Sequence, residues 1–286
     1  MWPYLYNLLL LTKPRIGVLV LLTGAAALTV EGSFNSRPSS FLMVMLGLFA
    51  VSGSANALNQ YFERGIDSLM SRTRVKRPLP LGRLVPWQAL VFAVMLGVGG
   101  VLLFSITFNV LSAAIALFAI LFYGAFYTVW LKPRTHLNIV IGGAAGALAP
   151  VIAWAAGAGS VGWPSVVMFL VIFFWSPPHF WALAMYLKQD YKAAGLPMMP
   201  IVRGDIETSR QILSYTIVTV CSSLLLLPAT PGVVYLVSCI ALGAMFIWRA
   251  LGLRREISVS AEKKMFGYSI VYLCLLFVAI IIQATV

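Results

Sequence analysis

Long, nearly continuous apolar runs are the sequence feature that most restricts how this chain can fold. They recur along the 286 residues, and neighbouring positions stay apolar instead of alternating with polar ones. A helix that crosses a bilayer needs about 20 apolar residues, and its backbone must satisfy its own hydrogen bonds. Continuous runs of this kind indicate helices rather than the strands of a barrel. We therefore predict an all-α membrane protein.

Nine such runs can be counted, and the composition agrees with a chain that lies mostly in lipid. Hydrophobic residues make up 61% of the sequence and charged residues 10%, whereas soluble domains carry about a quarter charged residues. We expect one domain over residues 1–286, with nine transmembrane helices in a bundle around a central cavity that opens near the cytoplasmic side. The predicted spans are residues 16–30, 40–62, 87–107, 110–131, 137–157, 163–187, 211–229, 232–250 and 265–284.

The connections between these spans alternate between short, nearly uncharged segments and more polar ones. A cytoplasmic N-terminus places every Lys and Arg except Arg37 on the cytoplasmic side, as the positive-inside rule requires. It places every acidic residue except Glu31 there as well. We expect the N-terminus in the cytoplasm, the C-terminus outside, and the polar chemistry at the cytoplasmic helix ends. The net charge of +12 is then a sign of topology and not of nucleic-acid binding.

The end of the second predicted span carries an unusual set of polar residues. Asn59, Glu63 and Asp67 are spaced four residues apart, so on a helix they share one face. Their oxygen atoms suit Mg²⁺, which takes one or two carboxylates and completes its shell with water and phosphates. Arg72 and Arg77 follow in a dense group of cations that suits a diphosphate. A solvated cytoplasmic loop would explain the cations, but it would not explain the stacked oxygen ligands.

This motif and several other stretches resemble the UbiA-type intramembrane prenyltransferases. In that family a motif of Asn and Asp at this spacing precedes Arg-Thr and Arg-Pro pairs, which stand here at residues 72–73 and 77–78. The family often has Asp where Glu63 stands, and Glu reaches further towards a metal. Residues 11–16, 127–143, 175–184 and 190–198 resemble the branch of the family that farnesylates heme. The Pro-Pro-His stretch at residues 177–179 distinguishes this branch from the quinone-forming one.

The resemblance implies an enzyme that transfers a farnesyl group from farnesyl diphosphate to the vinyl group of heme b, giving heme O and diphosphate. It implies Mg²⁺ held by Asn59, Glu63 and Asp67, with Arg72, Arg77 and His179 as further catalytic residues. It also implies a bacterial or archaeal plasma membrane and a downstream heme A synthase as a partner. The substrate-binding residues that we predict are Lys13, Arg15, Tyr61, Tyr127, Lys132, Asn138, Lys188, Asp190 and Tyr191.

His179 follows two prolines in the cytoplasmic half of the sixth predicted span. Because proline lacks a backbone donor, Pro177 and Pro178 are predicted to break the helix locally. Irregular backbone at membrane depth is tolerated where it lines a cavity or is buried in protein. His179 is then either a heme-contacting or proton-transferring ring, or a buried histidine bonded to a freed carbonyl. The sequence does not choose between these roles.

Gly142 and Gly146 form a pair of small residues four positions apart in the fifth predicted span. Such pairs let the backbones of neighbouring helices approach closely. We predict close helix packing at this pair.

Three other functions remain open at this point. A prenyltransferase of the same family could act on another aromatic or tetrapyrrole acceptor. A transporter would carry charges at the centres of its spans, and none of the predicted spans has an Asp, Glu, Lys or Arg at its centre. A heme chaperone without enzyme activity would keep His179 and would not need the acidic motif.

Overall fold

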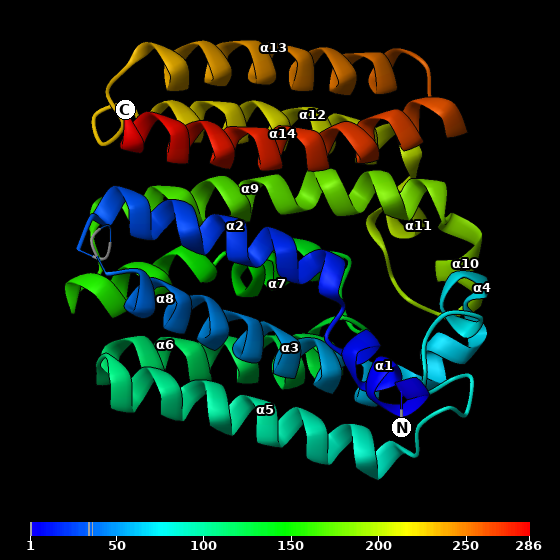
Figure 1. The fold of residues 1–286 in the computed structure, drawn as a ribbon. Helices are drawn as coiled ribbons and strands as arrows, with labels where there is room; N and C mark the ends of the chain where they lie inside the picture. Colours follow the sequence, from blue (N-terminus) through cyan, green and yellow to red (C-terminus); the bar gives the residue numbers. More distant parts are fainter. Residues whose placement is uncertain (1, 34, 36) are drawn as a thin grey trace.

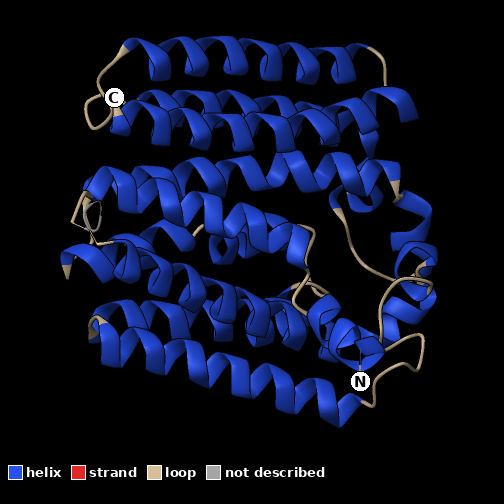
Figure 2. Cartoon of the chain, in the orientation of Figure 1, coloured by secondary structure: helices blue, strands red, loops and turns tan. Residues whose placement is uncertain are grey.

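The computed structural model describes residues 2–33, 35 and 37–286, and all regular elements in these residues are helical (Figure 1, Figure 2). The predicted all-α class is therefore confirmed. The long helices are α2 (Pro14–Glu31), α3 (Pro38–Leu69), α5 (Pro86–Thr107), α9 (Trp163–Tyr186), α12 (Gly204–Leu224), α13 (Val233–Arg255) and α14 (Val259–Thr285). Two further segments are each built from consecutive pieces, α6 (Val110–Leu121) with the π-helix η1 (Phe122–Leu131), and α7 (Asn138–Gly146) with α8 (Ala149–Ala158). The short helices are α1 (Trp2–Leu11), α4 (Ser71–Arg74), α10 (Lys188–Ala193) and α11 (Met199–Val202).

The long helices lie side by side, and the short helices α1, α4, α10 and α11 gather at one end of the bundle (Figure 1). The N-terminus lies at this end and the C-terminus at the opposite end. Helix α3 packs against α5 and η1, while α9 packs against α7, α12 and α14. The end with the short helices also holds the connections that the sequence predicts to be polar.

Eight helical segments of the described residues are long and apolar enough to cross a membrane, so the chain is an integral multi-pass membrane protein. The remaining predicted span is the seventh, residues 211–229, and it coincides for most of its length with α12. This helix has 21 residues but is more polar, with Asp205 and Glu207 in its first turn. Its buried Thr216, Thr219 and Ser222 hydroxyls donate to carbonyls of the preceding turn, which satisfies them inside the bundle. The count of nine stays a prediction.

Helix α9 shows that the predicted break at Pro177 and Pro178 is wrong. The helix runs from Trp163 to Tyr186 with both prolines inside it. Prolines are tolerated in transmembrane helices where surrounding helices support the segment, and α9 is enclosed by α7, α12 and α14. His179 is therefore presented on a regular helix, and its direction follows from helical geometry.

The predicted glycine pair packs closely at only one of its two positions. A Cβ atom on Gly142 would lie inside the van der Waals distance of the Tyr127 ring, so only glycine lets α7 meet η1 there. The neighbouring Gly143 is similarly tight, because its Cβ would lie 2.9 Å from the Cβ of Ser176 on α9. A Cβ on Gly146 would meet nothing within 4 Å. The prediction of close packing is therefore wrong for Gly146.

Candidate active site

The three predicted metal ligands lie on one buried face of α3. This helix ends at Leu69, beyond the predicted end at residue 62, so Glu63 and Asp67 belong to its last two turns. The exposed fractions are 2% for Asn59, 2% for Glu63 and 1% for Asp67. Two carboxylates buried this deeply need partners, because isolated buried charges are strongly unfavourable. Their side chains face the protein interior rather than open solution.

Three cations reach this face from three different connections: two pair with the carboxylates and the third binds the Asn59 amide. Lys132, just after η1, forms an ion pair with Glu63. Arg77, in the connection after α4, forms an ion pair with Asp67 and lies 3.5 Å from Glu63. Lys13, between α1 and α2, donates from Nζ to Oδ1 of Asn59 at 2.8 Å. Three cations against two carboxylates leave a surplus of positive charge, which favours a polyanionic ligand.

The orientation of the Asn59 amide follows from a hydrogen-bond chain into η1. The Thr128 hydroxyl donates to the carbonyl of Tyr123 at 2.7 Å, so it can only accept from Asn59. Asn59 Nδ2 donates to Thr128 Oγ1 at 3.1 Å, which turns Oδ1 towards Lys13. Thr128 Oγ1 reaches a carbonyl five residues earlier, in the wide turn of a π-helix, a feature found frequently at functional sites.

Lys13 reaches Asn59 from a left-handed backbone conformation. Its φ is 52°, which is rare for a residue with a side chain and is retained only where the surroundings enforce it. Gln60 helps to enforce it, since its Nε2 donates to the carbonyls of Leu10 (3.1 Å) and Leu11 (3.0 Å) at the end of α1. Burial, reinforced by the charge of Arg77, holds the pKa of Lys13 well below its usual value. An incoming anion would raise this pKa again.

Aromatic side chains line the same region. Tyr123 and Tyr127 on η1 stack with their ring centroids 5.4 Å apart and their planes 10° from parallel. The charges of Glu63 and Arg77 act on the Tyr123 hydroxyl, and Tyr191 interacts electrostatically with both tyrosines. The structure therefore brings Tyr127 and Tyr191, two predicted substrate-binding residues, together beside the acidic face of α3.

Asn138 is a fifth predicted substrate-binding residue close to this region, because its Nδ2 also donates to the carbonyl of Lys132 at 3.3 Å. It is fully buried at the start of α7, and its Nδ2 donates to the carbonyl of Thr135 at 2.6 Å. Its Oδ1 is buried without a hydrogen-bond partner among the residues that the structure describes. A buried acceptor without a donor is energetically unfavourable, which sets Asn138 apart from the satisfied polar groups around it.

Five other predicted residues have side chains that lie outside the acidic cluster. Lys188 donates to both carboxylate oxygens of Asp205 at 2.8 Å, at the start of α12. The guanidinium of Arg64 lies over the Tyr61 ring in a cation–π contact, with its Cζ atom 4.7 Å from the ring centroid. The side chains of Arg15 and Arg72 are exposed, and no ion pair within the described ranges engages them.

Asp190, the fifth of these residues, joins two segments at the end of the bundle. It accepts hydrogen bonds from the Ser71 hydroxyl at 2.7 and 2.9 Å and from the backbone N–H of Arg72 at 3.2 Å. Slight burial raises the pKa of Asp190, but these donors outweigh it and hold the pKa below its usual value. Asp190 thus connects the segment after α9 to α4, which follows the acidic face of α3.

His179 lies in a different environment, between α9 and α14. Its Nδ1 is 2.7 Å from the Ser269 hydroxyl, which in turn donates to the carbonyl of Phe266. The ring stacks on Trp175 at 4.4 Å and on Phe266 at 4.7 Å. Its partner is a hydroxyl and not a carbonyl freed by proline. No hydrogen bond, ion pair or ring contact links it to the acidic cluster within the part of the chain that the structure covers.

The residues at the end of α3 fit Mg²⁺ by the chemistry of their donor atoms. They offer two carboxylates and one amide oxygen on a single helix face. Within the described residues no group of three or more His, Cys, Asp or Glu side chains could hold a metal by itself. A site with few protein ligands suits Mg²⁺, which usually keeps waters and binds substrate phosphates.

Sequence reasoning missed several residues that shape this site, chiefly Gln60, Ser71, Thr128 and Ser269. Thr128 lies inside a stretch that resembles the family, so its position was the available signal. The others act through contacts between residues far apart in sequence, such as the 50 positions between Gln60 and Leu10.

Comparisons with known proteins agree with this architecture. Residues 18–281 match the UbiA prenyltransferase family. The chain is 47% identical to a protoheme IX farnesyltransferase of Gloeobacter violaceus, over 94% of this chain and 88% of that protein. It is 44% identical to a protoheme IX farnesyltransferase of Symbiobacterium thermophilum, over 96% of this chain and 93% of that protein.

Solved structures share the fold at lower sequence identity. A digeranylgeranylglyceryl phosphate synthase superposes with a TM-score of 0.81 at 21% identity and covers 98% of both chains. A UbiA homolog from Archaeoglobus fulgidus, bound to DMAPP and Mg²⁺, superposes with a TM-score of 0.70 at 14% identity, over 98% of this chain and 99% of that one. With the family match over most of its length and close relatives at high coverage, the chain belongs to the UbiA prenyltransferase family, in its protoheme IX farnesyltransferase group.

Proposed function

We propose that this protein transfers the farnesyl group of farnesyl diphosphate to the vinyl group of heme b, releasing diphosphate and giving heme O. The observation that carries the proposal is the buried face of α3, where two carboxylates and an amide oxygen meet three cations. Relatives named protoheme IX farnesyltransferase, at 42–47% identity over nearly the whole chain, support heme as the acceptor.

The first task of these residues is to bind the diphosphate. Lys13, Arg77 and Lys132 point their cations into one small region from three separate connections. In the absence of an anion, Arg77 and Lys132 pair with Glu63 and Asp67, and Lys13 binds Asn59. Diphosphate oxygens would compete for these cations, because charge-assisted hydrogen bonds to phosphate are among the strong ones in proteins. The cations would then stabilise the negative charge that grows on the leaving group.

Mg²⁺ would be held by Asn59, Glu63 and Asp67 once the cationic side chains that now contact these residues turn towards the diphosphate. Bound Mg²⁺ supplies Lewis-acid chemistry that neutralises the diphosphate and makes it a better leaving group. The relative bound to DMAPP and Mg²⁺ supports this requirement. Thr128 fixes the Asn59 oxygen, and Arg77 bridges both carboxylates, so the ligand set is oriented before substrate arrives.

The second task is to protect the allylic carbon after its bond to oxygen weakens. The stacked Tyr123 and Tyr127 lie next to the acidic face and offer aromatic surface to a developing cation, on the order of 1–2 kcal/mol per ring when desolvated. The surrounding apolar helices exclude water and dissolve the farnesyl tail. The new carbon–carbon bond forms at the heme vinyl group, and the addition of water at the neighbouring carbon completes the hydroxyethyl-farnesyl group of heme O.

The same proposal gives the protein an orientation and a place in a reaction sequence. The N-terminus would lie in the cytoplasm of a bacterium or archaeon, because the cationic connections gather at the end of the bundle that holds it (Figure 1). An enzyme that oxidises heme O, a heme A synthase, would consume the product.

The experiment that tests the proposal uses the purified protein with farnesyl diphosphate, Mg²⁺ and heme b, and it identifies the porphyrin product by mass. We expect heme O to form with heme b and to disappear when EDTA removes the metal. Hydroxybenzoate, naphthoate and chlorophyllide serve as competing acceptors. Product formation with one of these and not with heme b would overturn the assignment of heme as acceptor. Activity that survives EDTA would overturn the Mg²⁺ site.

A further inference from the structure

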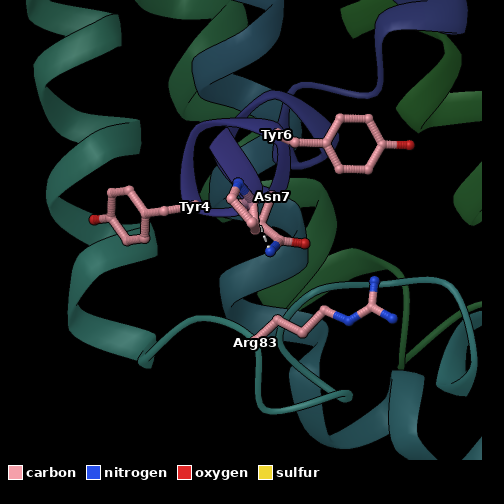
Figure 3. A pocket seen from close by; sticks show the side chains of 5 residues that line it. Tyr4, Tyr6, Asn7 and Arg83 are labelled. Carbon is pink, nitrogen blue, oxygen red and sulfur yellow. Dashed lines mark hydrogen bonds between the residues drawn. The ribbon is translucent and has the colours of Figure 1, made fainter. Parts of the chain in front are cut away.

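A pocket outside the acidic cluster lies between α1 and the connection from α4 to α5 (Figure 3). It has a volume of about 410 Å³, and its walls are Pro3, Tyr4, Tyr6, Asn7 and Arg83. Asn7 and Arg83 lie near its middle, while Tyr4 and Tyr6 extend to opposite sides (Figure 3). Because α1 lies among the short helices, the pocket is at the end of the bundle that holds the polar connections (Figure 1).

Asn7 presents an unsatisfied acceptor in this pocket. Its side chain is only 7% exposed, and its Nδ2 donates to the carbonyl of Pro3 at 2.7 Å. A carbonyl only accepts hydrogen bonds, so the amide nitrogen must face Pro3 and the oxygen must face away from it. That Oδ1 is buried without a partner among the described residues. A buried acceptor of this kind calls for a donor from a ligand, because an unmade hydrogen bond is unfavourable.

Arg83 presents a cation to the same space. Its side chain is exposed, and none of the ion pairs that the structure records between described residues includes it. A tight turn positions it, with Gly82 at a φ of 65° and the Arg83 backbone N–H donating to Pro78 at 2.9 Å. An arginine with free donors in a pocket suits a phosphate group, whose oxygens match the guanidinium geometry.

The surface around the pocket identifies the source of that phosphate. Helix α1 exposes Tyr4, Leu5, Tyr6 and Leu9 by 42–57%, and Trp87 at the start of α5 is 61% exposed. Exposed tyrosine, tryptophan and leucine on a short helix are typical of a segment that lies in the headgroup region of a bilayer. A phosphate that reaches this pocket from its surroundings is therefore part of a lipid.

We propose that this pocket binds the headgroup of an anionic phospholipid that carries a hydroxyl, such as phosphatidylglycerol. Arg83 binds the phosphodiester, and a headgroup hydroxyl donates to Oδ1 of Asn7. The site is separate from the acidic cluster, because Arg77 of the same connection faces Glu63 and Asp67 while Arg83 faces α1. The ligand is a lipid and not a substrate of the transfer reaction.

The test measures which lipids stay bound to the detergent-purified protein in native mass spectrometry. The probes are phosphatidylglycerol, phosphatidylcholine and phosphatidylmethanol, the last of which has the same charge as phosphatidylglycerol but no headgroup hydroxyl. We expect one phosphatidylglycerol to be retained in preference to the other two. Arg83→Gln should weaken this binding roughly tenfold, which is what the loss of one charge-assisted hydrogen bond gives. Arg255→Gln removes another exposed arginine, at the end of α13, and should leave the binding unchanged.

Asn7→Leu tests the proposed hydrogen bond between a headgroup hydroxyl and Oδ1 of Asn7. This variant should keep its affinity for anionic lipid and lose the preference for phosphatidylglycerol over phosphatidylmethanol. Equal weakening in Arg83→Gln and Arg255→Gln would show binding by overall charge alone and would overturn the pocket. Displacement of the lipid by millimolar glycerol phosphate or inorganic phosphate would overturn the assignment of a lipid as the ligand.

Discussion

The end of α3 and the middle of α9 both bury polar side chains in an apolar bundle, but the two regions stabilise them in opposite ways. Glu63 and Asp67 are matched by cations from distant connections, with positive charge left over. His179 has one uncharged partner, Ser269, and lies between the rings of Trp175 and Phe266. In the first region the cations can leave the carboxylates and bind an incoming anion. In the second region the aromatic neighbours hold the imidazole ring of His179 in a fixed orientation.

The largest effect should come from the charged region. Asp67→Ala removes a proposed metal ligand and leaves Arg77 without its closest partner. Because metal-assisted charge stabilisation is worth several kcal/mol, we expect heme O formation to fall by about 10³-fold or more. The rate is measured with saturating heme b, farnesyl diphosphate and Mg²⁺.

Glu63→Ala should have the same result, and both variants should insert into the membrane and elute as the unmodified protein does. Phe62→Ala is the matched control, because Phe62 is an exposed neighbour on the same helix. Full turnover in either acidic variant would remove the charged region from the mechanism.

A smaller effect should follow when the stacked Tyr123 and Tyr127 rings beside the charged region are displaced without changing any charge. In Gly142→Ala the new methyl group would collide with Tyr127 and push it from its stack with Tyr123. Displacing a positioned group by about 1 Å can cost roughly 10²-fold in rate. Gly146→Ala adds the same methyl group one turn later, where nothing lies within 4 Å, and should keep its activity. Equal rates in the two variants would show that the tyrosine stack does not position substrate.

The same two regions show what the sequence could and could not predict. Asn59, Glu63 and Asp67 were predictable as a group, because helical periodicity alone puts them on one face. Their partners were not, since Lys132 is 69 positions from Glu63 and Lys13 is 46 positions from Asn59. Lys13 and Lys132 were expected to bind substrate from the family resemblance, but the side chains that they contact depend on how the helices pack.

Local rules failed where packing or wider helical turns override them. Two adjacent prolines predicted a break in α9, yet the neighbouring helices keep it regular. The π-helical turns of η1 cannot be read from a period of 3.6, and they are what brings Thr128 to Asn59. Lys188 and Asp190 are predicted to bind substrate from their position after the sixth span; without substrate each one contacts a neighbouring segment, and the substrate role stays a prediction.

A variant of the uncharged region around His179 should change the KM of one substrate and leave the KM of the other unchanged. His179→Phe keeps an aromatic ring for Trp175 and Phe266 but removes the hydrogen bond to Ser269. If His179 holds the acceptor, the KM for heme b should rise about tenfold, as the loss of one hydrogen bond to a ligand gives, while the KM for farnesyl diphosphate stays the same. Ser269→Ala keeps the imidazole and should have a weaker effect of the same kind. Equal increases in both KM values would assign His179 to packing alone.

The smallest effect should come from Asp190, which joins α10, the helix after α9, to α4, the helix after α3. Asp190→Ala removes this link, but Asp190 is only partly buried and its hydrogen bonds are exposed to solvent, and such interactions are worth less than about 1 kcal/mol. We expect activity to fall by less than about threefold. The pKa of Asp190 is lower in the folded protein than in the unfolded chain, so its contribution is complete above the unfolded value, about 3.9, and is lost as the pH falls through the folded value. Thermal unfolding of the two proteins should therefore differ slightly at pH 7 and converge in acid, and a difference that grows on acidification would contradict this role.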